Sequence, residues 1–432
     1  MKKTTYLVLI LACTALPVFA NSLVLTEESA VEMALAQNLE LKSSKLDLEM
    51  TEDQNNNSWN ILLPDLSVTG GLVRSDSLSD SLIDGSWTLS GSVDASVTLN
   101  TSSFLYMDYD RLSHESQLLS YQMDEDELIV EVKKDFYYLL AYQQSLELER
   151  KNLELAEKRQ LQTETNFKNG LASELDVLEA QNAYESLRPS YTTTKTSYET
   201  QLMSFKSLIG LALKQPIELE GELTPDILEL DAEKLVNTFL PERQDVQSSL
   251  KALEVKENLL SITNLSDRSP SLTLSLDWDN SASDLTSIDW SDSFSVSTYL
   301  TMPLNGFIPG SKESIEISDA QKAVKQARLN YQNVVDSAEQ EIRTLVMELS
   351  SYRENIDITK QSVQLARKTY EMTEAAYNQG TKELLYVEEA QNTLFSAELD
   401  LLESRYNYLS GLLDLQYALN TSADELKTFS EK

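Results

Sequence analysis

Four stretches of the chain alternate apolar and polar residues, the pattern of a strand with two different faces. In residues 86–100 every odd position is Trp, Leu, Gly, Val or Ala, and every even position is Ser, Thr, Asp or Asn. Successive side chains of a strand point to opposite faces, so one face is apolar and the other is polar. The same alternation predicts strands at about 64–74, 86–100, 270–280 and 290–304.

Each predicted strand is long enough to cross a bilayer at a tilt. Trp87, Trp278 and Trp290 lie at or near strand ends, where membrane proteins carry aromatic girdles. A soluble sandwich with one buried face would show the same alternation, but the small, hydroxyl-rich polar face favours a water-filled lumen. Membrane barrels begin at about eight strands. Two or three chains would therefore have to share one barrel.

Two very long runs have the period of an amphipathic helix. From Phe104 to about Lys168 there is no proline or glycine, and apolar residues recur at spacings of three and four. A helix of that length measures about 97 Å at 1.5 Å per residue. Residues 311–378 repeat the pattern. Glycine at Gly170 and Gly380 is expected to end each rod in the left-handed conformation and to let the chain reverse.

The chain also repeats itself. Residues 167–182 contain F-x-x-G and E-A-Q-N, and residues 377–392 contain Y-x-x-G and E-A-Q-N, 210 positions later. This self-similarity predicts two tandem repeats, about 23–222 and 223–420, each built as helix, two strands, rod, turn and returning helix. The helices ahead of the strands are expected at about 27–60 and 241–266, and the returning helices at about 171–208 and 381–419. The segments at about 210–240 and 420–432 are expected to form a belt around the rods.

The first twenty residues predict a secretory signal. A positive start, an apolar core and Val18-Phe19-Ala20 favour cleavage after Ala20. Lipid attachment at Cys13 is the alternative, and cleavage at Ala20 would leave no cysteine. Past residue 20 no stretch approaches the roughly 18 consecutive apolar residues of a transmembrane helix, so contact with a membrane would have to come from strands.

Composition and charge narrow the possible functions. The chain has 70 acidic and 35 basic residues and a net charge of −35, which argues against nucleic acid as a partner. Most carboxylates are expected to serve solubility, and some could line a cation-favouring water path. His114 is the only histidine, so we expect no catalytic site, metal site or cofactor. The acidic run at 124–127 predicts a solvated helix face, with a cation site as the weaker alternative.

In their order, these features resemble the TolC-type outer-membrane efflux proteins. The similarity covers nearly all of the chain after the signal. It is seen in the opening L-T-E-E-S-A-V at 25–31, in L-P-D-L-S at 63–67, and most strongly in residues 167–181. P-E-R-Q-D at 241–245 is similar to a drifted form of the family's Arg-Pro-Asp segment.

The resemblance implies a mainly α fold with a small β part. Four transmembrane strands per chain would contribute to a shared twelve-stranded barrel of a homotrimer in the lipid of the outer membrane. Long antiparallel helical hairpins would form an α-barrel tunnel across the periplasm. Their tips would meet a periplasmic adaptor protein that links them to an inner-membrane transporter. The chain would then be a passive exit duct of an efflux or type I secretion system.

Candidate functional residues follow from position and resemblance. We expect Asp176 and Glu388 to contribute to an acidic aperture. The second tip departs from the first, because Tyr386 stands where the first tip has Asp176. An exported structural or adhesive rod without a pore is the rival function, and a periplasmic adaptor is a weaker third. The residues expected to contact the adaptor are Asn169, Gly170, Leu171, Ala172, Ser173, Gln379, Gly380 and Thr381.

Overall fold

The computed structural model describes residues 23–75, 86–283 and 289–429. The predicted signal at 1–20, with Cys13, lies outside these residues. The chain divides into two compact units. The first unit comprises Met1–Asn38, Glu131–Pro225 and Ile356–Asn407, and the second comprises Leu39–Val130, Asp226–Asn355 and Tyr408–Lys432.

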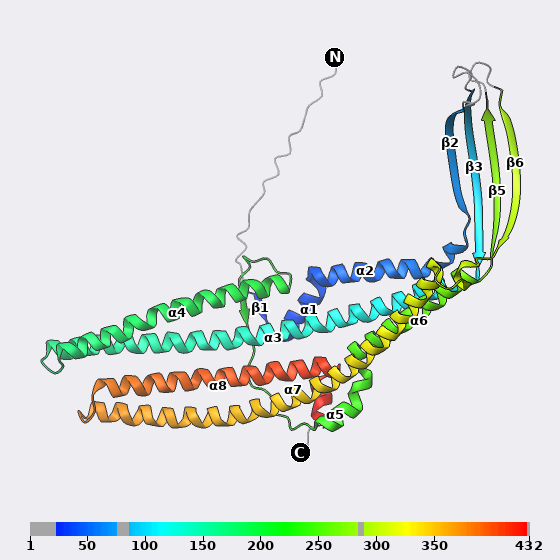
Figure 1. Cartoon of the computed structure of the whole chain (residues 1–432). Coiled ribbons are helices and arrows are strands. Elements are labelled where there is room, and N and C mark those ends of the chain that lie inside the picture. Colours follow the sequence, from blue (N-terminus) through cyan, green and yellow to red (C-terminus); the bar gives the residue numbers. More distant parts are fainter. Residues whose placement is uncertain (1–22, 76–85, 284–288, 430–432) are drawn as a thin grey trace, which may run out of the picture. The chain divides into compact units, whose positions relative to one another are not determined.

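The second unit holds one four-stranded antiparallel sheet in the order β2-β3-β5-β6 (Figure 1). Strands β2 and β3 come from the first predicted repeat and β5 and β6 from the second. The pairing of β3 with β5, from Leu89 opposite Ala282 to Asn100 opposite Ser271, joins the two pairs. The strands are β2 (Asp65–Ser75), β3 (Ser86–Asn100), β5 (Ser271–Ala282) and β6 (Ser291–Thr301).

The last strand is shorter than the sequence predicts. Strand β6 ends at Thr301, so Met302 and Leu304, which continue the alternation, lie outside it. Pro303 lacks the N–H that a sheet ladder needs, which stops the strand there. A short 3-10 helix, η3 (Asn305–Phe307), follows.

Each of the two predicted rods is a single helix in the structure. Helix α3 (Thr101–Lys168) has 68 residues and α7 (Lys312–Asn378) has 67, which confirms two uninterrupted helices. Each continues from one unit into the other. The returning helices are α4 (Glu174–Leu208) and α8 (Leu384–Leu419). Among the described helices, none is long and apolar enough to cross a membrane.

The first helix of the chain is broken, which the sequence does not predict. Helix α1 (Glu27–Gln37) ends at Asn38, whose backbone is extended (φ −55°, ψ 134°), and α2 (Leu39–Asn56) begins at the next residue. The Asn38 side-chain amide donates to the Leu208 carbonyl at 2.9 Å. This bond holds the break against the end of α4.

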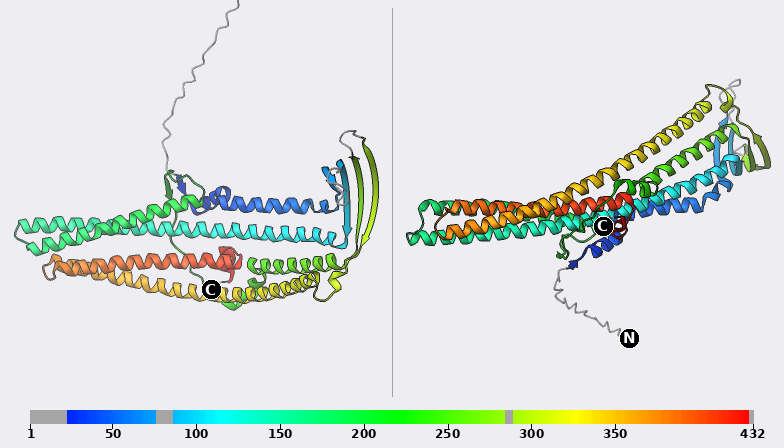
Figure 2. Two further views of the ribbon diagram at one scale, coloured as in Figure 1. Left: turned by 45° about the horizontal axis from the view of Figure 1, so that its top comes forward. Right: turned by 90° about the horizontal axis from the view of Figure 1, so that it is seen from below.

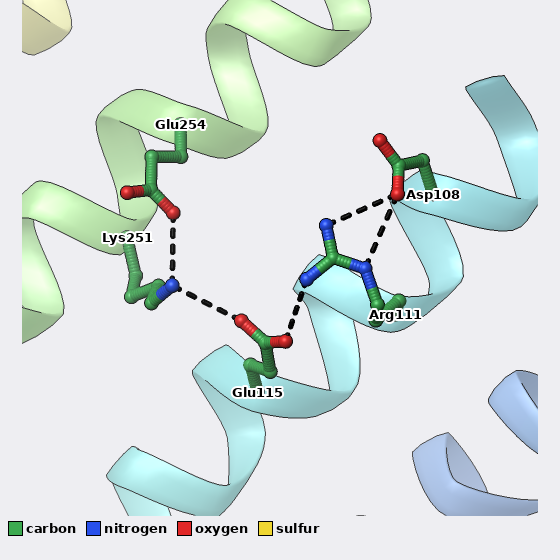
Figure 3. Close-up of polar contacts among 5 residues, drawn as sticks. All are labelled: Asp108, Arg111, Glu115, Lys251 and Glu254. Atoms are coloured by element: carbon green, nitrogen blue, oxygen red, sulfur yellow. Dashed lines mark hydrogen bonds and ion pairs between the residues drawn. The ribbon is translucent and has the colours of Figure 1, made fainter.

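Ion pairs tie α3 to α6 (Gln244–Arg268) within the second unit (Figure 3). On α3, the Arg111 guanidinium lies 3.0 Å from Asp108 and 2.6 Å from Glu115. On α6, the Lys251 ammonium lies 3.0 Å from the same Glu115 and 2.9 Å from Glu254. Of these four pairs, Lys251–Glu115 joins the two helices, and because both side chains are partly exposed it stabilises the contact by at most about 1 kcal/mol.

Small elements complete the second unit. Phe239, at the end of α5, packs its ring 5.2 Å from Phe429 of α9. On α7, Arg343 lies 2.8 Å from Glu233, and Arg353 lies 3.1 Å from Glu229. The elements are η1 (Ser58–Leu62), α5 (Ala232–Phe239), η2 (Leu240–Glu242) and α9 (Ala423–Phe429).

In the first unit, α3 lies beside α4 and α7 beside α8 (Figure 2). Its core includes Phe136 of α3 and Phe205 of α4, whose ring centroids are 6.4 Å apart. A short parallel pair, β1 (Leu23–Leu25) with β4 (Ile217–Leu219), was not predicted. Three-residue strands are too short for alternation to show.

Candidate functional site

The apolar face of the four-stranded sheet is not covered by the rest of the described chain. Val68 on β2 is 82% exposed and Leu300 on β6 is 74% exposed. A soluble sandwich would bury this face within its own chain, so that alternative does not fit the structure. A large exposed apolar surface indicates contact with lipid or with another protein.

The other face of the sheet carries hydroxyl groups and carboxylates in register. Ser67, Asp94, Asp277 and Ser295 stand in one row across the four strands. The Ser67 hydroxyl donates to Asp94 at 3.3 Å, and the Ser295 hydroxyl donates to Asp277 at 3.2 Å. This is a surface suited to water and to cations rather than to a packed core.

Both edges of the sheet are open. Within the described residues, β2 pairs only with β3, and β6 pairs only with β5. Each edge therefore presents a row of unpaired backbone N–H and C=O groups. Such groups cost several kcal/mol each in lipid, so a sheet in a membrane requires further strands on both sides.

Exposed aromatic residues lie near the strand ends. Trp87 is stacked by the Arg74 guanidinium at 5.8 Å, and Trp290 precedes β6. Trp59, in η1 just before β2, is also exposed and was not assigned to a girdle from the sequence. The closeness of Trp59 to the start of β2 is the feature of the sequence that could have placed it in the girdle.

The two helical tips have the same backbone. Gly170 has φ +72° and Gly380 has φ +73°, as the sequence predicts. The Leu171 N–H donates to the Asn166 carbonyl at 2.8 Å, and the Thr381 N–H donates to the Ala376 carbonyl at 3.0 Å. Both turns therefore close with the hydrogen bond that follows a left-handed glycine. The predicted contact residues Asn169, Gly170, Leu171, Ala172, Ser173, Gln379, Gly380 and Thr381 all lie in these two turns.

The two aperture candidates have different surroundings. The Asp176 carboxylate accepts the Ser173 N–H at 2.7 Å and so completes the capping box of α4, whose N-cap is Ser173. Glu388 is half-buried, and burial raises the pKa of its carboxyl; the charge of Arg159 opposes this increase and that of Glu179 adds to it. Over the described ranges, no hydrogen bond or ion pair joins Asp176 to Glu388. The charges that act on Glu388 are those of Arg159 and Glu179 and do not include that of Asp176.

Hydrogen bonds form a polar bridge between α3 and α8 that the sequence does not predict. The Arg159 guanidinium donates to Gln391 Oε1 at 2.6 Å, and the Gln391 amide donates to Asn152 Oδ1. Beside it, a cavity of about 60 Å³ borders Glu388 and has room for a few water molecules. Gln391 is buried, whereas Gln181, its counterpart 210 positions earlier, is exposed.

The remaining polar candidates, His114 and the acidic run at 124–127, both lie in α3. Over the described ranges, no three His, Cys, Asp or Glu residues could hold a metal ion. His114 is half-buried within α3. In the acidic run at 124–127, Asp126 accepts a bond from Gln244 at 2.6 Å and Asp124 accepts one from Ser44. This run is thus only partly a solvated face.

An exposed apolar sheet face joined in one chain to long helical hairpins defines a class of outer-membrane channels. The chain belongs to the outer membrane efflux protein family, whose model matches residues 30–211 and 235–421. It is an outer-membrane efflux duct with a mainly α fold and a small β part.

Known relatives support this assignment. Outer membrane protein TolC of Salmonella enteritidis is 24% identical over 418 residues, covering 90% of this chain and 81% of that protein. The outer-membrane channel CmeC of Campylobacter jejuni matches in fold with a TM-score of 0.77 at 19% identity, over 91% of this chain and 85% of that one. VceC of Vibrio cholerae matches with a TM-score of 0.75 at 17% identity, over 92% and 96%. Each of these three is named as an outer-membrane protein or an outer-membrane channel.

Proposed function

We propose that three copies of the chain close one twelve-stranded β-barrel in the outer membrane, and that their hairpins form an α-barrel duct through the periplasm. The open sheet is the observation that carries this proposal. Its apolar face is uncovered, and its two edge strands, β2 and β6, are each unpaired on their outer side within the described residues. Neighbouring copies would pair both edges and leave the serine-rich face toward water.

The number of copies can be tested directly. Two chains would supply eight strands and three would supply twelve, and the family resemblance favours three. Native mass spectrometry of the detergent-solubilised protein should give three chains per assembly. Two chains per assembly would contradict the trimer, and a monomer that is stable without detergent would contradict the barrel itself.

The duct conducts passively in this proposal. Its polar row of Ser67, Asp94, Asp277 and Ser295 offers groups that solvate cargo but no chemistry that drives it. An inner-membrane transporter, linked through a periplasmic adaptor, would supply the energy for export of small solutes or of proteins. Single-channel current across a planar bilayer containing the purified protein should show stable open levels. Their absence would contradict a pore.

The two tips are the proposed docking site for the adaptor. No atom outside its own turn lies within 4 Å of a Cβ built at Gly170 or Gly380, so only the positive φ restricts these positions. Gly170→Val with Gly380→Val should distort both turns and abolish export, while the barrel still assembles. Gly310→Val is the matched control, because Gly310 has φ +82° and the same open surroundings but lies in the turn just before α7, away from both tips. Unchanged export in the double variant would exclude the tips.

Asp176 and Glu388 are the proposed acidic aperture. If they line the path, Asp176→Asn with Glu388→Gln should lower the permeability ratio of K⁺ to Cl⁻ several-fold, because two carboxylates per chain are neutralised. The exposed Glu389 provides the control, as Glu389→Gln removes one charge beside the same site. Equal ratios in all three proteins would place the aperture elsewhere.

A structural rod without a pore is the second candidate function. Long paired helices are its only support, and the exposed apolar face of the sheet argues against it. Extraction of membranes separates the two functions. A rod should be released by carbonate or salt, whereas a membrane barrel should need detergent.

A further inference from the structure

Arg405 of α8 differs from the other arginines of the described chain. Over residues 23–75, 86–283 and 289–429, each of the others has a hydrogen bond, an ion pair or a ring contact, and Arg405 has none. Its side chain is half-buried. In a chain with 70 acidic residues, a guanidinium without an acceptor among the described residues keeps its N–H donors available for a bound group.

Arg405 borders a groove in the first unit. The groove has a volume of about 450 Å³ and lies between α3, α8 and the segment from Leu219 to Gly221. That volume falls within the range of small-molecule sites. Leucine side chains form most of its apolar lining: Leu140, Leu148, Leu219, Leu401 and Leu402.

The acidic residues at the groove already have cationic partners. Glu147 lies 2.7 Å from Arg150, and Glu398 lies 2.6 Å from Arg367. Neither carboxylate is within ion-pair distance of Arg405. The groove thus combines an apolar lining with one uncompensated guanidinium, and its charge complements an anion.

We propose that this groove binds a small amphipathic anion, such as a medium-chain carboxylate. The acyl chain would lie along the leucines, which removes its apolar surface from water. The head group would accept hydrogen bonds from Arg405, whose planar guanidinium matches a carboxylate with two parallel N–H donors. Gln144, exposed at the edge of the groove, would lie near the entrance.

Photolabelling tests this site on the full chain in a neutral detergent. The probe is dodecanoate with a diazirine on its acyl chain, and labelled peptides are mapped by mass spectrometry. We expect labelling within residues 140–151 and 398–405. Arg405→Gln should lower it about ten-fold, the effect of losing hydrogen bonds to a charged group. The methyl ester of the probe lacks the negative charge, so it should label the wild-type protein as weakly as the charged probe labels Arg405→Gln.

A matched control separates the site from general charge effects. Arg328→Gln removes an arginine of α7 that is paired with Glu257 at 3.0 Å, and it should leave labelling unchanged. Equal labelling of wild type and Arg405→Gln would overturn the proposal. So would an Arg405→Gln variant that separates into single chains, because a carboxylate of a second copy would then be the partner of Arg405.

A second pair of variants does not depend on Arg405. Gln144→Glu adds a negative charge at the exposed edge of the groove and should lower labelling several-fold, whereas Gln144→Lys should raise it. Neither change buries a charge, so both proteins should keep the wild-type helical circular dichroism. Labelling that responds to neither variant would also overturn the proposal. The test does not rest on conduction or on the number of copies.

Discussion

The returning helices α4 and α8 hold the same place in the two repeats, yet the chain buries them to different extents. Both follow a left-handed glycine, and they have 35 and 36 residues. Helix α4 buries three residues, Ala180, Phe205 and Lys206. Over its part in the first unit, through Asn407, helix α8 buries Leu384, Val387, Ala390, Gln391, Ala397 and Leu402.

The difference is clearest at matching positions near the tips. Leu178 on α4 is 56% exposed, while Glu388, which lies 210 residues later on α8, is half-buried. An exposed leucine and a half-buried carboxylate invert the usual preference. The repeat thus sets the course of the backbone but not the surroundings of each side chain. Within the described chain, the apolar side chains of Leu175, Leu178 and Met203 on α4 stay exposed.

The largest expected effect concerns the one end of α4 that is firmly packed. Phe205 is fully buried against Phe136, so Phe205→Ala should lower the local stability of α4 by about 4 kcal/mol. Amide hydrogen exchange across residues 198–208 measures it. Leu178→Ala is the control and should cost little, because Leu178 is exposed. Similar costs for both variants would mean that α4 is packed along its whole length.

The second effect concerns a proline that only α4 contains. Pro189 lies inside the helix, where it has no N–H for the Glu185 carbonyl, while Leu399 holds the corresponding position in α8. Proline in a helix interior costs about 3 kcal/mol, so Pro189→Ala should slow amide exchange around residues 185–192 by up to about a hundred-fold. Ser190→Ala should change exchange far less. If exchange stays as fast in Pro189→Ala, the proline does not weaken α4.

A smaller effect is expected at the polar bridge of α8. Gln391→Leu removes an acceptor of Arg159 and the donor to Asn152, which leaves the buried Asn152 Oδ1 without its hydrogen bond. This should weaken the α3–α8 contact by about 2 kcal/mol, seen as faster exchange across residues 384–397. Gln181→Leu, the exposed counterpart, should have little effect. If Gln391→Leu and Gln181→Leu change amide exchange equally, the buried bridge does not make the α3–α8 contact more stable than the packing of α4.

The sequence predicted the parts of the fold that depend on regular spacing. The apolar period and the lack of breakers located α3 and α7, and the glycines located both tips, because positive φ is a local property of Gly170 and Gly380. Alternation located the four strands to within a few residues. Local rules were sufficient wherever a long element repeats one pattern.

Features that depend on contacts between distant segments were not predicted. The break at Asn38 is stabilised by Leu208, 170 residues away, and the β1–β4 pair has only three residues per strand. Burial of Gln391 follows from what α8 packs against, and Gln181 in the same motif is exposed. The roles of Asp176 and Glu388 at an aperture stay predictions, because they depend on neighbouring copies.

The smallest expected effect is a pH dependence at Glu388. Burial raises the pKa of this carboxyl, so the folded hairpin binds its proton more tightly than the unfolded chain does. Ionised Glu388 therefore costs stability at neutral pH, and the cost disappears as pH falls through the raised pKa. Amide exchange across residues 384–392, corrected for its intrinsic pH dependence, should slow by a few-fold between pH 7.5 and pH 5. Glu388→Gln should abolish this change and Glu389→Gln, at an exposed position, should retain it. A pH response that survives in Glu388→Gln would assign the titration to another group, and α4 and α8 would then not differ in this respect.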